Sequence, residues 1–249
     1  MGLVETEAIV LRVYPLAEAD KIVVCLTRSS GVVRAVAKGA KRLKSRFGAG
    51  LEPFTLLHLS YFEKEGRELV TLRQTEIQRS YFKLSQRAET IAALSYMSEL
   101  VMEFAPPHEP NEKLFRMVRA TLEAVPEGLA DMTALLRYFE IWTLKLAGFL
   151  PEFRRCAECG ANFKAEETAY MNAEFKLRCQ QCSQRMGMAL TAATRAQILS
   201  IQRLSPADYS QAATAVTAAG GGEMAQLTQR LISHVLERSP RLQATTYST

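Results

Sequence analysis

Four cysteines form two closely spaced pairs in the second half of the chain. Cys156, Cys159, Cys179 and Cys182 follow the pattern C-x2-C-x19-C-x2-C. Two intervening residues let both thiolates of a pair face one ion, and two such pairs supply the four sulfur ligands that tetrahedral zinc prefers. The spacing therefore predicts a single Zn²⁺ ion in a zinc ribbon at about residues 153–187, with a hairpin at residues 166–177.

The predicted zinc ion would be structural, because four thiolates leave no coordination position for a catalytic water. Redox exchange is a competing interpretation, since a C-x-x-C pair also suits dithiol chemistry. A further alternative is that the four thiols are unrelated to one another. The fifth cysteine, Cys25, lies in an apolar segment and is interpreted as a small buried strand residue.

Residues suited to catalysis are scarce. The three histidines, His58, His108 and His234, lie far apart in the sequence, and each is interpreted as a surface or hydrogen-bonded side chain. The segment Gly39-Ala40-Lys41 lacks the remainder of a phosphate-binding loop, and the sequence contains neither G-x-S-x-G nor H-E-x-x-H. The sequence therefore favours a binding protein over an enzyme.

Positive charge is concentrated near the N-terminus. The whole chain carries a net charge of +5, and residues 1–79 hold thirteen Lys and Arg against nine Asp and Glu, an excess of four. Residues 28–46 contain seven basic residues and no acidic one. This distribution indicates a polyanionic partner, although a solvated charged loop would have the same composition. The side chains expected to neutralise phosphates of such a partner are Arg34, Lys38, Lys41, Arg42, Lys44 and Arg46.

The hydrophobic pattern predicts an α+β protein. Short segments typical of strands occur at residues 6–14, 22–27, 32–38, 54–62 and 68–73. Five strands in so short a length indicate a small barrel at residues 1–80, with the long basic loop between the third and fourth strands. A flexible cationic loop at this position is one with which an OB-fold could bind nucleic acid. The aromatic residues Tyr14, Phe47 and Tyr61 are candidates for base stacking, or else for the core.

From about residue 84 the apolar period becomes that of helices. Pro106 and Pro107 end the first helix, and Asn111 is suited to cap the second. Further helices are expected at residues 133–147, 191–204 and 223–237, with Gly148 ending the first of these and Ser205-Pro206 ending the second. The predicted second domain, residues 81–249, is therefore mostly helical, and the zinc module is inserted in it.

Several blocks of sequence, taken in order, resemble the RecO family of recombination mediators. The first blocks lie in the predicted barrel and the last runs up to the first cysteine pair; they are Val10-Leu11-Arg12, Glu18-Ala19-Asp20-Lys21-Ile22-Val23, Gly31, Val36-Ala37-Lys38-Gly39-Ala40-Lys41-Arg42, Leu51-Glu52-Pro53-Phe54, Leu136-Arg137-Tyr138-Phe139-Glu140 and Leu146-Ala147-Gly148-Phe149. The resemblance extends from about residue 5 to residue 182, and residues 242–249 match no family segment.

This resemblance implies an N-terminal OB-fold, a helical domain and a four-cysteine zinc module. It also implies binding to single- and double-stranded DNA, annealing of complementary strands, binding to RecR, RecF as a further partner, and assistance in loading RecA on strands coated by single-strand-binding protein. RecO-like proteins also bind the acidic C-terminal tail of single-strand-binding protein on their helical domain.

The helix expected at residues 133–147 is the predicted site for that acidic tail. Phe139 and Trp142 would line an apolar cleft, although Trp142 is also well suited to the core. Arg137 and Lys145 would remain available to the carboxylates of the tail.

Three other functions compete with this interpretation. A zinc-ribbon transcription regulator would bind one DNA sequence far more tightly than others, a nuclease or hydrolase would cleave DNA in a metal-dependent manner, and a pure scaffold would not bind DNA. The absence of a signal peptide, and of an apolar segment near the ~18 residues of a membrane span, predicts a cytoplasmic, nucleoid-associated protein without a membrane partner.

Overall fold

The computed structural model describes residues 2–63, 66, 68–81, 83, 84, 87–125, 129–213, 221–237 and 240. The chain divides into two compact units, the first running to Glu123 and the second spanning Ala124–Pro240. The first unit contains a barrel and two helices. The second unit contains the remaining helices and the four cysteines.

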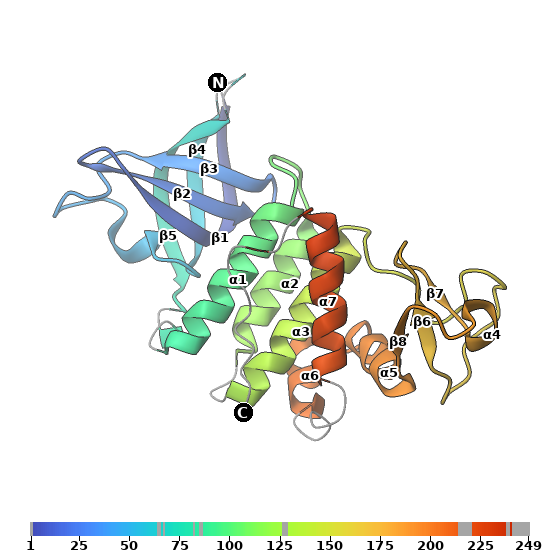
Figure 1. Cartoon of the computed structure of the whole chain (residues 1–249). Coiled ribbons are helices and arrows are strands. Elements are labelled where there is room, and N and C mark those ends of the chain that lie inside the picture. The colour runs from blue at the N-terminus through green and yellow to red at the C-terminus, as the bar shows by residue number, and fades with distance from the viewer. Residues whose placement is uncertain are drawn as a thin grey trace. The chain divides into compact units, whose positions relative to one another are not determined.

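Five strands form a closed barrel in the first unit (Figure 1). They are β1 (Gly2–Leu16), β2 (Asp20–Thr27), β3 (Gly31–Ala37), β4 (Leu56–Glu63) and β5 (Leu69–Arg79). Their order around the barrel is β1-β2-β3-β5-β4, in which β3 and β5 are parallel and β4 returns to pair with β1. The predicted OB-fold barrel is confirmed.

Strand β1 closes the barrel because it serves two neighbours. Its first half pairs with β4 and its second half with β2, and a bulge interrupts the register between Val10 and Arg12. Such a bulge bends a strand and increases its twist, as barrel closure requires. Alternate side chains of all five strands then point inward and form one core cluster, which includes Ala8, Val23 and Leu72.

Two helices follow the barrel in the first unit. Helix α1 (Ala88–Phe104) ends before Pro106, and α2 (Glu112–Glu123) is capped by Asn111, whose side-chain oxygen accepts a hydrogen bond from the Leu114 backbone N–H at 3.0 Å. Both helix boundaries agree with the prediction from the prolines and the capping residue. An interaction between the loop joining these helices and the β2–β3 turn fixes their position against the barrel.

Gly31 lies at the centre of this interaction. It has a φ of +61°, and a Cβ atom added there would lie 2.1 Å from the carbonyl oxygen of Glu109. The Val32 carbonyl accepts a hydrogen bond from the His108 N–H at 3.3 Å. Arg28, in the same turn, bridges to Glu7 at 2.9 Å and to Glu112 at 2.6 Å. Only glycine permits the backbones to approach this closely.

Gly31→Ala is therefore expected to destabilise the first unit by about 2–4 kcal/mol, because the new methyl group combines a left-handed backbone with a backbone clash. Gly48→Ala is the matched control. Gly48 has a φ of +51°, but an added Cβ meets nothing within 4 Å, so only the conformational cost of about 1–2 kcal/mol applies. Urea unfolding of both variants measures the difference; equal losses would contradict the close approach at Gly31.

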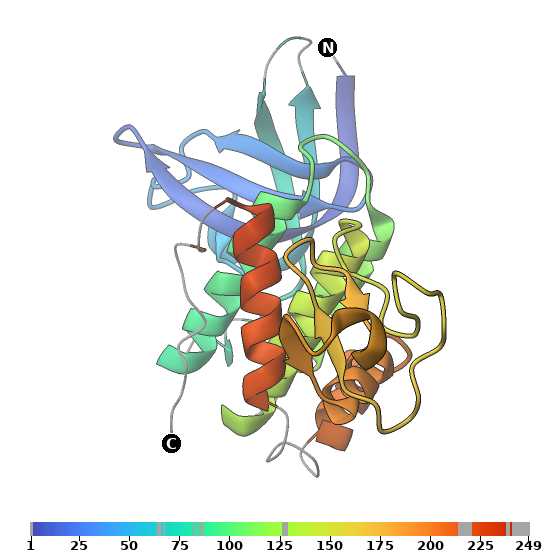
Figure 2. The same cartoon turned by 45° about the vertical axis from the view of Figure 1, so that its right-hand side comes forward.

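Helix α3 (Leu129–Leu146) organises the second unit, where α5 (Ala192–Ile201), α6 (Pro206–Ala213) and α7 (Gly221–Val235) contact it. Figures 1 and 2 show these helices around α3. Thr191 caps α5 through a hydrogen bond from the Thr194 N–H. Gly148 follows the end of α3 with a φ of +81°, as predicted.

Helix α6 was not expected. Pro206 was interpreted as a residue that ends a helix, whereas in the structure it begins one. Proline suits the first helical position because its missing N–H has no intrahelical partner there. Ser205 provides the cap, since its hydroxyl accepts a hydrogen bond from the Asp208 N–H at 3.1 Å. The Ser-Pro-x-Asp pattern was the signal in the sequence.

The four-cysteine module, residues 153–187, is inserted between α3 and α5. Its strands β6 (Ala169–Met171) and β7 (Leu177–Arg178) form the predicted hairpin, and β8 (Met188–Leu190) pairs with the free edge of β6. The short helix α4 (Gln180–Ser183) is capped by Cys179, contains Cys182 and lies beside this sheet (Figure 2). The third strand was not anticipated. Residues 242–249 lie outside the described residues.

Candidate metal centre and nucleic-acid interface

The structure brings the four cysteines together. The Sγ atoms of Cys156, Cys159, Cys179 and Cys182 all lie within 4.8 Å of one another. The first pair lies on a turn completed by Gly160, whose N–H donates to the Cys156 carbonyl at 3.0 Å. The second pair lies at the start of α4. Four convergent sulfur atoms at this separation fit a tetrahedral metal ion.

The surrounding backbone favours a sulfur anion in this cluster. Burial raises the pKa of Cys156, but hydrogen bonds from the backbone N–H groups of Cys159, Cys179 and Glu158 outweigh it and lower the pKa to about 6. A hydrogen bond with Cys179, followed by burial, raises the pKa of Cys182 to about 12. A cation bound among the four sulfur atoms would supply the positive charge that stabilises thiolates.

Arg195 of α5 attaches the module to the helices of its own unit. Its Nη2 donates to the carbonyl oxygens of Lys164 at 3.0 Å and Glu167 at 2.6 Å, and its guanidinium lies 4.8 Å from the centre of the Phe163 ring. Burial lowers the pKa of Arg195 from its ordinary value. Within the module, Arg178 and Glu158 form an ion pair that links the two cysteine pairs.

The six predicted phosphate-binding side chains are all exposed, on β3 and on the loop that follows it. Arg34 points outward from β3, and the others lie on residues 38–47, here called the basic loop. The Gly39 N–H donates to the Asp20 carboxylate at 2.8 Å, and Lys41 donates from its backbone N–H to the Ala19 carbonyl and from Nζ to the Ala17 carbonyl, at 2.9 and 2.7 Å. The basic loop is thereby held against the β1–β2 turn.

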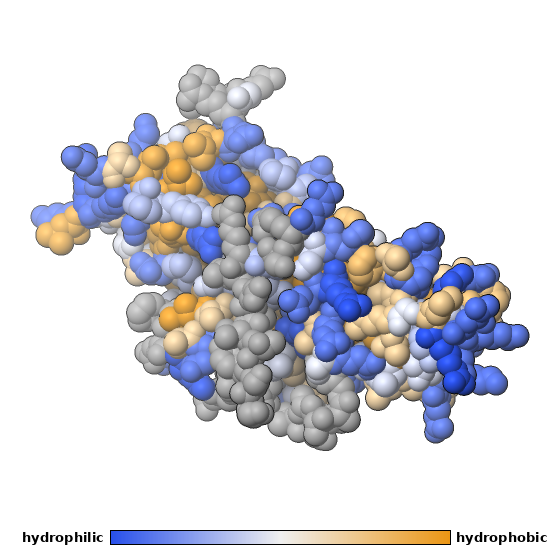
Figure 3. Space-filling view, in the orientation of Figure 1, coloured by the Kyte–Doolittle hydropathy of each residue, from blue (hydrophilic) through white to orange (hydrophobic). Residues whose placement is uncertain are grey.

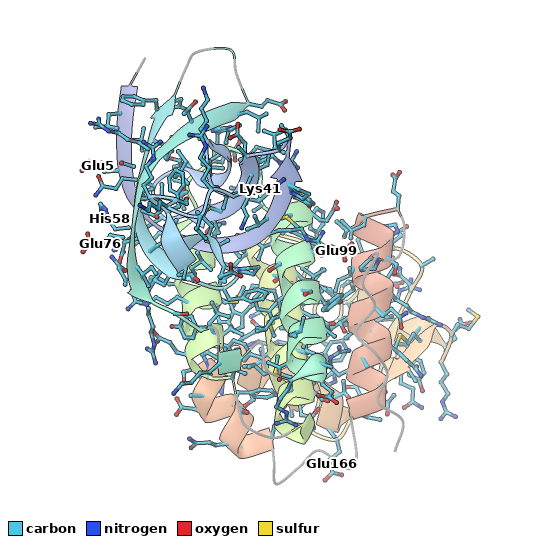
Figure 4. The ribbon with its side chains drawn as sticks, turned by 90° about the vertical axis from the view of Figure 1, so that its left-hand side faces the viewer. Glu5, Lys41, His58, Glu76, Glu99 and Glu166 are labelled. Carbon is cyan, nitrogen blue, oxygen red and sulfur yellow. The ribbon has the colours of Figure 1, made fainter. Side chains whose placement is uncertain are left out.

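Charge on the barrel is divided between two sides. Glu7 of β1, His58 of β4 and Glu76 of β5 are cross-strand neighbours in one row. Figure 4 shows Glu5, His58 and Glu76 along one side of the barrel, apart from Lys41. The row of Glu7, His58 and Glu76 and the basic loop thus lie on different parts of the barrel surface.

The three candidate stacking residues separate into two groups. Phe47 and Tyr61 are 3% and 1% exposed and belong to the barrel core, whereas Tyr14 is 41% exposed. The Arg12 guanidinium lies 6.0 Å from the centre of the Tyr14 ring. Tyr14 is therefore the one of the three candidates whose ring faces solvent.

The two residues predicted to bind an acidic tail have different surroundings. Arg137 is buried, pairs with the buried Glu140 at 2.9 Å and donates to the Thr228 hydroxyl at 3.4 Å. It is not available to an external carboxylate, which corrects that part of the expectation. Lys145 is partly exposed and lies 4.4 Å from the centre of the Trp142 ring. A role for this helix in tail binding stays a prediction.

The two apolar residues predicted to line a cleft on this helix pack within the second unit or form a hydrogen bond in it. Phe139 is 1% exposed, so it is a core residue. Trp142 is half-buried, and its indole N–H donates to the Ile201 carbonyl at 3.0 Å. Only Trp142 keeps part of its ring at the surface.

The histidines occupy separate settings. His58 is exposed on β4. His108, in the α1–α2 loop, lies 3.7 Å from the carboxylate of Glu63 on β4. The His234 ring lies against the Phe175 ring, with the ring centres 4.5 Å apart. Cys25 is buried in the barrel core, where burial raises its pKa to about 12. Its interpretation as a buried strand residue is confirmed.

Comparison with known proteins places both parts of the chain in one family. The model described as "Recombination protein O N terminal" matches residues 1–81, and the model described as "Recombination protein O C terminal" matches residues 85–243. Among the described residues, no helix combines the length and the apolar character needed to cross a membrane.

Curated relatives named "DNA repair protein RecO" align with the chain. The protein of Symbiobacterium thermophilum is 32% identical over 243 residues, which cover 97% of this chain and 94% of the relative. That of Anaeromyxobacter dehalogenans strain 2CP-C is 32% identical over 96% of this chain and 93% of its own length. The Koribacter versatilis protein is 38% identical over 64% of either chain, just under two thirds of each. With its closed five-stranded barrel, helical unit and four-cysteine cluster, the chain belongs to the RecO family of recombinational DNA repair proteins.

Proposed function

We propose that this protein is a non-catalytic recombination mediator that binds single- and double-stranded DNA and anneals complementary strands. The observation that carries the proposal is the row of six exposed cations on β3 and the basic loop. Lysine and arginine side chains bind phosphates without reading the base sequence. Tyr14, exposed on the same barrel, provides a ring for base stacking.

The four-cysteine cluster is proposed to hold one structural Zn²⁺ ion. Zinc supplies no reaction there, because four thiolates complete its coordination, and its contribution is to fix the fold of the module. The four cysteines would hold the ion, and the hydrogen bonds of Arg195 to the Lys164 and Glu167 carbonyls link the module to α5.

Family membership supports further proposals about partners. RecR is the proposed partner in loading RecA on strands coated by single-strand-binding protein, and RecF is a further candidate. Because Arg137 and Phe139 are buried, the proposed site on α3 for the acidic tail of single-strand-binding protein consists of Lys145 and the partly exposed Trp142. A cation next to an aromatic ring suits a peptide that combines carboxylates with an apolar end.

The DNA interface is tested by removing charge from the basic loop. Lys38→Gln, Arg42→Gln and Lys44→Gln together are expected to flatten the dependence of log K on log salt for duplex DNA by about 2 to 3 units, since each lost phosphate contact removes about 0.9. Lys41 is left intact because its Nζ anchors the loop to Ala17. Fluorescence titration at several salt concentrations measures the slope.

The matched control removes three exposed charges elsewhere in the first unit, with Lys83→Gln, Lys113→Gln and Arg116→Gln. This variant is expected to keep the original slope. Equal slopes for the two triple variants would place the DNA interface away from the basic loop.

The mediator function itself is tested by annealing. Complementary oligonucleotides precoated with single-strand-binding protein are mixed with and without this protein, and with and without RecR. Faster annealing with the protein supports the proposal, and the basic-loop variant should lose the effect. A zinc-ribbon transcription regulator is the alternative; a strong preference for one sequence among many unrelated duplexes would favour it.

A further inference from the structure

Leu43, in the middle of the basic loop, is fully exposed to solvent. Its relative exposure is 103%, whereas the next most exposed large apolar side chain among the described residues, Met186, is at 67%. Both sequence neighbours of Leu43, Arg42 and Lys44, are exposed cations. Figure 3 shows that apolar and hydrophilic residues lie side by side on this face of the barrel.

Hydrogen bonds fix the backbone of the basic loop on both sides of Leu43. Its first part is bonded to the β1–β2 turn through Gly39 and Lys41, as described above. After Leu43, the Ser45 N–H donates to the Arg42 carbonyl at 3.0 Å, and Phe47 enters the barrel core. Because the backbone on both sides of Leu43 is held by hydrogen bonds, little backbone entropy is lost when a ligand covers its side chain.

We infer that Leu43 is an apolar contact for the faces of unstacked bases in single-stranded DNA. This inference rests on the proposed role of the basic loop. When Arg42 and Lys44 bind phosphates, the side chain between them is brought against the strand. Contact with a base face removes its apolar surface from water, and every base offers such a face.

The same contact is much weaker on duplex DNA. There the base faces are covered by stacking, and inserting a wedge requires partial unstacking of a base step, which costs a few kcal/mol. The cations act on both forms of DNA, whereas Leu43 acts on single strands. Leu43 thus gives the basic loop a preference for single-stranded DNA that charge alone does not supply.

Leu43→Ala is the test, with Leu3→Ala as the matched control because Leu3 is a 47% exposed leucine on β1 of the same barrel. We expect Leu43→Ala to weaken binding to an oligothymidine strand about fivefold to tenfold, as for removal of a partly buried leucine side chain. Duplex affinity and the salt slope should stay unchanged, and Leu43→Phe should recover the single-strand affinity. Leu3→Ala should change none of these.

A base analogue reports the contact directly. The fluorescence of a single strand containing 2-aminopurine should increase when the wild-type protein unstacks the analogue, and should increase less with Leu43→Ala.

Loss of single-strand and duplex affinity in equal measure would overturn the inference, as would unchanged single-strand affinity. In the latter case, loss of binding to vesicles of anionic phospholipid would identify Leu43 as a membrane contact. If the basic-loop charge variant flattens the salt slope while Leu43→Ala has no effect, only this inference fails; if neither variant has an effect, the proposed function fails as well.

Discussion

Cys159→Ser is expected to abolish metal binding and to unfold the four-cysteine module. Four sulfur ligands within 4.8 Å of one another form the centre, and binding of structural zinc contributes on the order of 10 kcal/mol to the folding of small zinc modules. The chain around the ligands has only short strands and a four-residue helix, so little other structure would hold it. Elemental analysis should give one zinc per wild-type chain and none in the variant.

Unfolding of the module should be visible as local proteolysis. Trypsin is expected to cut Cys159→Ser within residues 153–187 while the barrel stays resistant. The matched control is Cys25→Ala, which removes a cysteine from the barrel core and should keep full zinc content. A metal-free wild-type protein with a protease-resistant module would contradict the assignment of the centre.

Arg137→Ala is expected to destabilise the second unit by about 3–5 kcal/mol, because removing one partner of a buried ion pair withdraws a counter-charge from the buried Glu140 carboxylate. The Arg137 and Glu140 side chains are only 10% and 2% exposed, and Arg137 also donates to Thr228 on α7. Thermal or urea unfolding measures the loss. The combination of Arg137→Met with Glu140→Gln should be less destabilised than the sum of the single changes.

Lys145→Ala is the control for this prediction and also the means of examining tail binding. Lys145 is partly exposed, so its removal should cost less than about 1 kcal/mol. Because Lys145→Ala stays folded, a lower affinity of this variant for an acidic tail peptide would reflect binding alone.

If Arg137→Ala were as stable as the wild-type protein, the buried pair of Arg137 and Glu140 would not stabilise the second unit.

Features that depend on residues close together in the chain were predictable from the sequence. The C-x2-C pairs need two intervening residues to converge on one ion, and Asn111 caps α2 through a residue three positions away. Strand alternation indicated five strands and a barrel, and the barrel is confirmed. Helix α6 also has a local signal at Ser205 and Pro206, because proline can begin a helix as well as end one.

The role of each charged or aromatic side chain was decided by tertiary structure. Phe47 at the end of the basic loop and Tyr14 on β1 are both aromatic residues, but only Phe47 enters the barrel core. Arg28 belongs to the same basic stretch as Arg42, yet it is bound by Glu7 and Glu112, and Glu112 is 84 residues away. Arg137 is buried against Glu140.

The physical reason lies in solvation and long-range pairing. A guanidinium or an aromatic ring is the same chemical group in every setting, and its contribution depends on whether water, a counter-charge or apolar side chains surround it. Those surroundings come from strands and helices that are distant in sequence. The sequence by itself therefore determined the cysteine pairs, the barrel and the position of the basic loop, whereas the folded chain decided which cations remain exposed and that Leu43 is exposed between two of them.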